Sequence, residues 1–317
     1  MKVPALLAAC LTAAVVATAA PAARAAEKLT VMLDWFVNPD HATLVVAREK
    51  GFFTAADLDV TLVAPADPND PPKLVAARRA DLAVSYQPQL HLQAAEGLPL
   101  ARVGTLVATP LNSLVVLDGG PVASIADLKG RKIGFSVGGF EDAVLGAMLE
   151  TAGLSLKDVT LINVNFALSP SIYAGQVDAV IGAFRNFELN QMDIAGKPGR
   201  AFFPEEHGVP AYDELILIAH HDRLSDPALR RFVDAVEQAT HYILNHPKEA
   251  WELFVRAYPD LDDELNRRAW ADTLPRFALR PAALDSARYQ RFAAFLTQRG
   301  LLKGDAPVLE SYAVELK

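Results

Sequence analysis

The chain has 317 residues, of which 51% are hydrophobic and 21% charged, and a formal net charge of −8. This length can bury one or two hydrophobic cores, and an acidic balance without a basic tract excludes a nucleic-acid partner held through its phosphates. The single cysteine, Cys10, excludes a disulfide framework and leaves the rest of the chain without a thiolate metal ligand or a cysteine nucleophile.

Residues 1–25 have the pattern of an export signal. Lys2 is followed by an apolar run over 5–20 and by Ala23-Arg24-Ala25, which is typical of a cleavage site. The run is shorter than the roughly 20 residues that a membrane-spanning helix needs. Residues 7–10 also match a lipoprotein box, but that box would leave an unusually short leader. We therefore expect a soluble periplasmic protein, with lipid anchoring through Cys10 as the less favoured alternative.

Short apolar strands alternate with helical patterns through most of the chain, which is typical of parallel sheets in an α/β fold. In the first part, strands are predicted at 29–33, 58–63, 81–85, 102–108 and 113–117, and helices at 42–51, 74–79 and 90–96. The pattern restarts after a turn cluster at 118–121, with strands at 132–136, 159–164 and 179–182 and helices at 141–151, 170–174 and 186–194.

A strand at 215–220 can return the chain to the first set of strands, and the remainder is helical. Ser225 is a candidate N-cap with Pro227 in the first turn, Pro247 begins a second helix, and a late helix covers 287–298. We predict an α/β protein of two lobes with mostly parallel sheets, joined by two crossings near residues 117 and 214. Lobe 1 would comprise 26–117 and 215–317, and lobe 2 would comprise 118–214.

The first candidate site follows the first strand, where Asp34, Trp35, Asn38 and His41 are crowded into one turn. The carboxyl ends of strands are where open α/β sheets bind ligands. Trp35 could stack on a flat heteroaromatic ring, and Asn38 offers donors and an acceptor to ring nitrogens. The alternative for the aromatic residues is that they cap the core, most of all for Phe36.

The second candidate site is at 182–188, at the end of a strand in the other lobe, where Phe184, Phe187 and Glu188 occur. A carboxylate between aromatic rings can accept from an exocyclic amine and an adjacent protonated ring nitrogen together. A core stripe for the two phenylalanines, and an ordinary first-turn acid for Glu188, are the alternatives. Tyr86 stands at a further strand exit, as a cleft wall or a core residue.

The glycine-rich turn at Gly138, Gly139 and Phe140 could hold an anion or a carbonyl oxygen on backbone N–H groups, or be a plain tight turn. Residues 134–138 also match G-x-S-x-G, so a serine hydrolase using Ser136 is an alternative from another class. No HGGG-like oxyanion segment accompanies it, and the histidines are scattered, with His220 and His221 on opposite faces of a strand. No metal site and no cofactor are predicted.

Three stretches of the chain resemble the type II periplasmic binding proteins of ABC importers. The opening at 33–36 with Asn38, His41 and the helix end at 47–53 is similar to the formylaminopyrimidine-binding group, which binds thiamine-pyrimidine precursors. Residues 80–87 look like a second signature of that group, and residues 173–179 match a segment of the wider superfamily. Members commonly have Trp or Tyr where this chain has Phe184 and Phe187.

The resemblance implies a monomeric, non-enzymatic receptor that closes by a hinge motion and delivers a small heterocycle to an ABC permease. Trp35 and Asn38 from one lobe would hold the ring together with Phe187 and Glu188 from the other. Related fungal enzymes that make the pyrimidine carry a cysteine-rich segment, which this chain lacks after residue 10. Receptors for a sulfonate, nitrate or a riboflavin-like heterocycle stay open as alternatives. A cluster of cations at the cleft would favour an anionic ligand. Arg185 is the cation beside these motifs.

Overall fold

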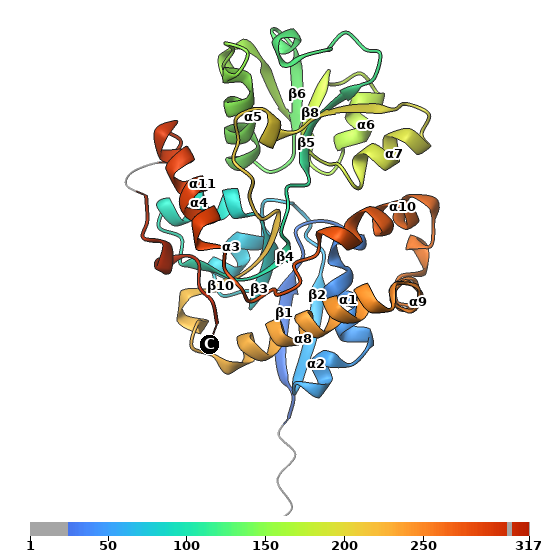
Figure 1. Cartoon of the computed structure of the whole chain (residues 1–317), viewed down its shortest axis with the longest axis vertical. Helices are drawn as coiled ribbons and strands as arrows, with labels where there is room; N and C mark the ends of the chain where they lie inside the picture. Colours follow the sequence, from blue (N-terminus) through green and yellow to red (C-terminus); the bar gives the residue numbers. More distant parts are fainter. Residues whose placement is uncertain (1–24, 303–305, 317) are drawn as a thin grey trace, which may run out of the picture.

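The computed structural model describes residues 25–302 and 306–316, and it has two lobes stacked along the long axis of the molecule (Figure 1). Each lobe is built on a five-stranded sheet, in the orders β2-β1-β3-β10-β4 and β7-β6-β8-β5-β9. The predicted export signal and the lipoprotein alternative at Cys10 lie outside the described residues, apart from Ala25.

In lobe 1, one strand, β10, is antiparallel to its neighbours, and the other four run in the same direction. These strands are β1 (Glu27–Met32), β2 (Leu58–Val63), β3 (Leu82–Ser85), β4 (Leu100–Val107) and β10 (Leu215–His220). The α-helices described in this lobe are α1 (Ala42–Glu49), α2 (Phe52–Ala55), α3 (Pro71–Ala76), α4 (Gln87–Ala95), α8 (Pro227–Asn245), α9 (Pro247–Ala257), α10 (Glu264–Thr273) and α11 (Ser286–Gln298), and the 3-10 helix η1 (Pro39–His41) precedes α1.

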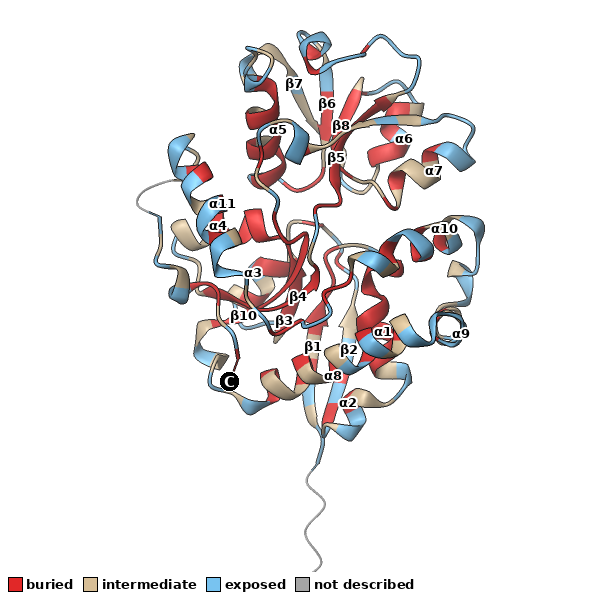
Figure 2. Cartoon of the chain, viewed as in Figure 1, coloured by how far each residue is buried: buried red, intermediate tan, exposed pale blue. Residues whose placement is uncertain are grey.

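Lobe 2 repeats this arrangement, with β5 as the antiparallel strand between β8 and β9. Its strands are β5 (Asn112–Leu117), β6 (Lys132–Phe135), β7 (Thr160–Asn163), β8 (Ala179–Phe184) and β9 (Gly199–Phe202), and its helices are α5 (Phe140–Glu150), α6 (Leu168–Tyr173) and α7 (Glu188–Ile194). Figure 2 shows the buried residues gathered on the central strands and on the helix faces packed against them, as expected of sheets covered on both faces.

The mostly parallel, two-lobed architecture was predicted from the alternation of strands and helices, but the first boundary was wrong. β5 was expected in lobe 1, and it pairs instead with β8 and β9 of lobe 2. The first crossing is therefore at 108–111 rather than at 117. An apolar strand pattern does not show which sheet the strand joins, because backbone hydrogen bonds can pair it with a strand of either sheet.

Three local differences have identifiable causes. The short edge strand β9, with the sequence Gly-Arg-Ala-Phe, was missed because it has no apolar run. Helix α3 begins at Pro71 and ends before Arg78, which has a φ of 58°, so it lies earlier than the predicted 74–79. The N-cap of α8 is Asp226 rather than Ser225, and its side chain accepts the Ala228 N–H.

Candidate functional site

A narrow cavity lies between the lobes, where the carboxyl ends of β1 and β3 face those of β6 and β8. Its free volume is about 20 Å³, so the surrounding side chains nearly fill it. Aromatic and acidic residues dominate its lining, which consists of Asp34, Trp35, Asn38, Tyr86, Phe140, Glu141, Leu168, Gly182, Phe184, Phe187 and Glu188.

The lobe 1 wall is held by a buried hydrogen-bond network around Asp34. One carboxylate oxygen lies 2.8 Å from His41 Nε2, and the other accepts the Tyr86 hydroxyl at 2.9 Å. The Asn38 N–H donates to His41 Nδ1 at 3.3 Å, and Asn38 Oδ1 accepts the Asp40 N–H at 2.8 Å as the N-cap of η1. These hydrogen bonds fix the turn, because they tie Asp34, Asn38 and His41 to one another and to Tyr86.

Aromatic rings from both lobes meet at the cavity. Tyr86 of lobe 1 stacks on Phe140 of lobe 2, with ring centroids 5.0 Å apart, and meets Phe184 edge-on at 6.4 Å. Trp35 contacts Phe166 of lobe 2 edge-on at 4.6 Å, and Phe166 also lies 4.4 Å from the half-exposed Phe36. Aromatic pairs of this kind contribute about 0.5–1.5 kcal/mol beyond area burial, so they help to hold the lobes together.

Two buried glutamates enter the cavity from lobe 2. Glu188 Oε2 accepts the Phe184 N–H at 2.7 Å, and Glu141 Oε2 accepts the Ser136 N–H at 2.7 Å. Burial raises the pKa of each of the two side chains to about 8, against the lowering effect of these backbone donors. The cavity therefore disfavours a bare carboxylate and favours a guest that brings hydrogen-bond donors.

Cations are absent from the residues that line the cavity in the described part of the chain. Arg185, the cation noted beside the lobe 2 motif, points instead to Glu205, with nitrogen–oxygen distances of 2.6 and 3.0 Å, and lies over the Phe203 ring. An anion would therefore meet acids without a compensating positive charge.

Eight of the predicted site residues line the cavity, and three do not. His41 is fully buried behind Asp34. Gly138 and Gly139 line a separate groove beside α4 and Leu301, although their neighbour Phe140 lines both spaces. The Gly138 N–H already donates to Asn69 Oδ1 at 3.0 Å, so the expected anion position on this turn is occupied by lobe 1.

The sequence analysis did not name Glu141, Leu168 or Gly182 as site residues, although Gly182 begins the segment 182–188. Glu141 could have been noticed as an acid in the first turn of the helix that follows the glycine-rich turn. Gly182 has a φ of 98°, and a Cβ there would lie 2.3 Å from Glu141 Oε1. Only a glycine tolerates both the positive φ and the close approach of Glu141. The close approach is visible only in the three-dimensional structure.

Ser136 lacks the surroundings of a nucleophile. Its side chain is fully buried, and its hydroxyl donates to the backbone carbonyl of Asn165 rather than to a histidine. The histidines that follow in the chain have other partners, among them the Leu100 carbonyl for His221 and the Leu279 carbonyl for His241.

None of the groups of three or more His, Cys, Asp or Glu side chains in residues 25–302 and 306–316 is placed to hold a metal ion. Within the same residues, the helices are too short or too polar to cross a membrane.

Direct contacts also join the lobes beside the cavity. Asn186 of lobe 2 donates through Nδ2 to Asp40 Oδ1 at 2.6 Å and to Thr273 Oγ1 at 2.8 Å. The Thr273 hydroxyl in turn lies 3.0 Å from Asp40 Oδ1, and all three side chains are buried. This cluster, which we call the Asn186 latch, connects the two turns that the sequence analysis singled out.

Two α/β lobes with one antiparallel strand each, two crossings and a cavity between them define the fold of type II periplasmic binding proteins. A solved structure supports this class: the alkanesulfonate-binding protein SsuA from Xanthomonas axonopodis pv. citri bound to MOPS matches with a TM-score of 0.72, covering 90% of this chain and 98% of that one at 18% identity. At that identity the likeness establishes the fold alone.

Residues 38–250 match the family described as NMT1/THI5 like, and the chain belongs to this family. A Haemophilus influenzae protein, whose name connects it with thiamine biosynthesis, is 57% identical over 294 residues, 92% of this chain and 93% of that one. The formylaminopyrimidine-binding protein of Halalkalibacterium halodurans is 37% identical over 228 residues, which cover 71% of this chain and 69% of that one. A more distant relative from Legionella pneumophila, 26% identical over 255 residues (79% and 80%), is named a 4-amino-5-hydroxymethyl-2-methylpyrimidine phosphate synthase.

Proposed function

We propose that this protein is the exported solute-binding component of an ABC importer and that it carries an aminopyrimidine precursor of thiamine. The observation that carries the proposal is the inter-lobe cavity, whose lining combines Trp35 and Asn38 of lobe 1 with Phe187 and Glu188 of lobe 2. The relative named as a formylaminopyrimidine-binding protein supports this ligand class. The protein would act as a monomer in the periplasm and present its closed form to a membrane permease.

Each side chain has a distinct task in this proposal. Trp35 stacks on the ring, Glu188 accepts from the exocyclic amine and the adjacent ring nitrogen, and Asn38 uses the hydrogen-bonding capacity that its capping role leaves free. The cavity is too tight for a ring in its present form. The lobes therefore separate by a hinge motion to admit the solute and then close over it.

A synthase activity, as in the names of the more distant relatives, is the alternative from another class. We favour a receptor because, among the described residues, the cavity lining contains no cysteine, lysine or histidine that could act as a nucleophile or as a general base. A serine hydrolase that uses Ser136 is disfavoured for a separate reason: the Ser136 hydroxyl donates to a backbone carbonyl.

A sulfonate or nitrate receptor is the alternative within the same fold. The structural likeness to a sulfonate-binding protein does not favour it, because the described lining of this buried cavity offers an anion no positively charged side chain to compensate its charge.

Calorimetric titration with 4-amino-5-hydroxymethyl-2-methylpyrimidine tests the proposal. We expect Trp35→Ala and Glu188→Gln each to weaken binding by about 1 kcal/mol or more, through lost stacking and a lost charge-assisted hydrogen bond. Trp251→Ala, which changes a tryptophan on α9 outside the cavity, is the control and should retain the wild-type affinity. Unchanged affinity in both site variants would remove this assignment, and a wild-type protein that binds no aminopyrimidine would remove the proposed ligand class.

A further inference from the structure

The two glutamates of lobe 2 reach the cavity from helices that follow adjacent parallel strands. Glu141 lies in the first turn of α5, after β6, and Glu188 begins α7, after β8. Strands β6 and β8 are hydrogen-bonded neighbours. Both acids therefore approach the same strand, β8, from one side of the cavity.

Their positions along β8 differ. The carboxyl group of Glu141 rests on the bare backbone of Gly182, where a Cβ would be 2.3 Å from Oε1, whereas Glu188 binds the N–H of Phe184. Two residues of a strand span roughly 7 Å. The amino group and the neighbouring ring nitrogen of an aminopyrimidine share one carbon, so this edge is too short to reach both carboxyl groups. The two carboxyl groups would therefore contact different edges of one guest.

The third acid of the cavity is less free to contact a guest. Both oxygens of Asp34 have protein partners, His41 and Tyr86. Glu141 instead has only backbone partners, the N–H groups of Ser136 and Val137, and its carboxyl group lies against Gly182, which itself lines the cavity. Burial raises the pKa of Glu141 to about 8, so an isolated charge there is unfavourable and a donor from the guest would compensate it.

Resting on the proposed function, we propose that Glu141 is a second specificity-determining residue, which accepts a hydrogen bond from a donor on the ring substituent while Glu188 contacts the amino edge. The site then selects unphosphorylated aminopyrimidines that carry donors on two edges. A phosphate ester is rejected, because its charge would be buried in a cavity whose described lining contains no cation to compensate it.

Calorimetry with two matched probes tests this inference. 4-Amino-5-hydroxymethyl-2-methylpyrimidine has the substituent donor, and 4-amino-2,5-dimethylpyrimidine lacks it. We expect the wild-type protein to prefer the alcohol by about tenfold and Glu141→Gln to reduce this ratio to below about threefold. Glu188→Gln should weaken both probes and leave their ratio unchanged. The phosphate ester of the alcohol should bind at least about 100-fold more weakly than the alcohol itself.

Asp142→Asn is the matched control, since it changes the next acid on the same helix turn, which lines the groove beside α4 instead. It should alter neither affinity nor ratio by more than about twofold. If Glu141→Gln does not fold, the methyl ether of the alcohol provides the test on the wild-type protein. The ether keeps the oxygen but loses the donor, and it should bind as weakly as the dimethyl compound.

The outcomes separate the two proposals. A folded Glu141→Gln variant with the wild-type ratio, a methyl ether that binds like the alcohol, or tight binding of the phosphate ester would overturn the role of Glu141. In each of those cases the proposed function stands if Trp35→Ala and Glu188→Gln still weaken binding. A wild-type protein that binds neither probe would overturn the proposed function itself.

Discussion

At the scale of single residues, Glu188 is an acid that lines the inter-lobe cavity and is unfavourable to ionise there. The side chain is buried, and desolvation raises its pKa to about 8 from a usual value of 4.5. Between these two values the folded protein holds a proton that the unfolded chain releases. The contribution of Glu188 to stability is therefore fully present below pH 4.5 and is lost as the pH rises through 8.

We predict that Glu188→Gln stabilises the ligand-free protein at alkaline pH, although it weakens binding. Glutamine resembles the protonated acid, so wild type and variant should melt together at pH 4.5. At pH 8 the variant should melt higher by about 2 °C or more, equivalent to at least about 1 kcal/mol. Thermal unfolding from pH 4.5 to 8 measures this gap, with Glu252→Gln on the exposed surface of α9 as the control. A gap that stays constant with pH would contradict the prediction.

At the scale of elements, the lobes meet where α7 lies beside η1 and α10. The buried Asn186 latch is the inner part of this contact, and burial raises the pKa of Asp40 within it to about 6. On the outside, Asn190 donates to Asp272 at 2.8 Å and Arg268 pairs with Asp193 at 2.6 Å. Exposed pairs contribute little, so the buried latch should dominate the stability of the closed form.

We predict that Asn186→Ala speeds ligand release without changing any residue that lines the cavity. Losing two buried hydrogen bonds, and leaving Asp40 without its amide donor, should raise the dissociation rate of the aminopyrimidine about fivefold to tenfold. Stopped-flow fluorescence is the measurement, since Trp35 lies at the cavity. Thr273→Val should act in the same direction, whereas Asn190→Ala at the exposed contact should change the rate by less than about twofold. Equal rates for Asn186→Ala and the wild type would show that the latch does not hold the closed form.

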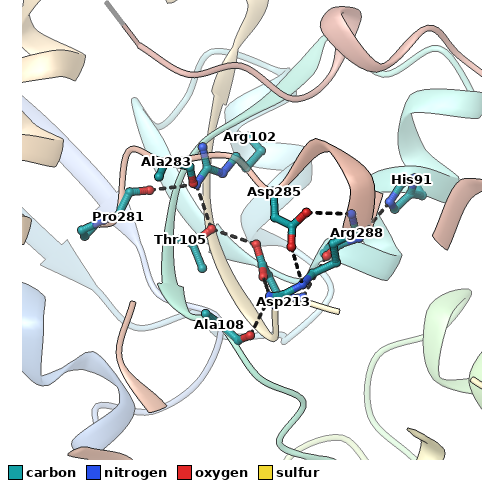
Figure 3. Close-up of polar contacts among 10 residues, drawn as sticks. His91, Arg102, Thr105, Ala108, Asp213, Pro281, Ala283, Asp285 and Arg288 are labelled. Carbon is teal, nitrogen blue, oxygen red and sulfur yellow. Dashed lines mark hydrogen bonds and ion pairs between the residues drawn. The ribbon is translucent and has the colours of Figure 1, made fainter. Parts of the chain in front are cut away.

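On the scale of the whole molecule, α11 of lobe 1 forms hydrogen bonds and an ion pair with both crossings between the lobes. Arg288 donates to the Ala108 carbonyl at 2.6 Å in the first crossing and pairs with the buried Asp213 in the second (Figure 3). Asp213 also accepts the Thr105 hydroxyl at 2.9 Å. One guanidinium group therefore fixes the relative position of the two segments about which the lobes would rotate.

Arg102 anchors the segment that precedes α11. Its guanidinium is fully buried and donates to the Pro281 carbonyl at 2.8 Å and the Ala283 carbonyl at 2.6 Å (Figure 3). The same group donates to the Thr105 hydroxyl at 2.9 Å. Arg288 therefore acts from a rigid base, because the segment leading to it is tied to β4.

We predict that Arg288→Ala widens the range of lobe orientations in the ligand-free protein. Removing one partner of a mostly buried ion pair should cost about 3 kcal/mol of stability, and the freed crossings should increase the radius of gyration measured by small-angle X-ray scattering. Added aminopyrimidine should restore the compact form, since ligand binding favours closure. Arg291→Ala, on the same helix and outside these contacts, is the control. A scattering profile identical to that of the wild type would argue against a hinge at this point.

The sequence by itself determined the alternation of strands and helices, and with it the positions at which strands end. Because ligands bind at such ends, it also identified the turns that contain Trp35 and Glu188. These features depend on local periodicity and on short-range turn chemistry. They could therefore be predicted from neighbouring residues alone.

Only the tertiary structure decided which strand ends face each other. It moved β5 into lobe 2, because pairing between distant strands is not encoded in either strand's own pattern. It turned Gly138 and Gly139 away from the cavity and brought in Glu141, whose place depends on the missing side chain of Gly182, 41 positions further along the chain. A cavity between two lobes is made of contacts that are distant in sequence, and packing alone brings them together.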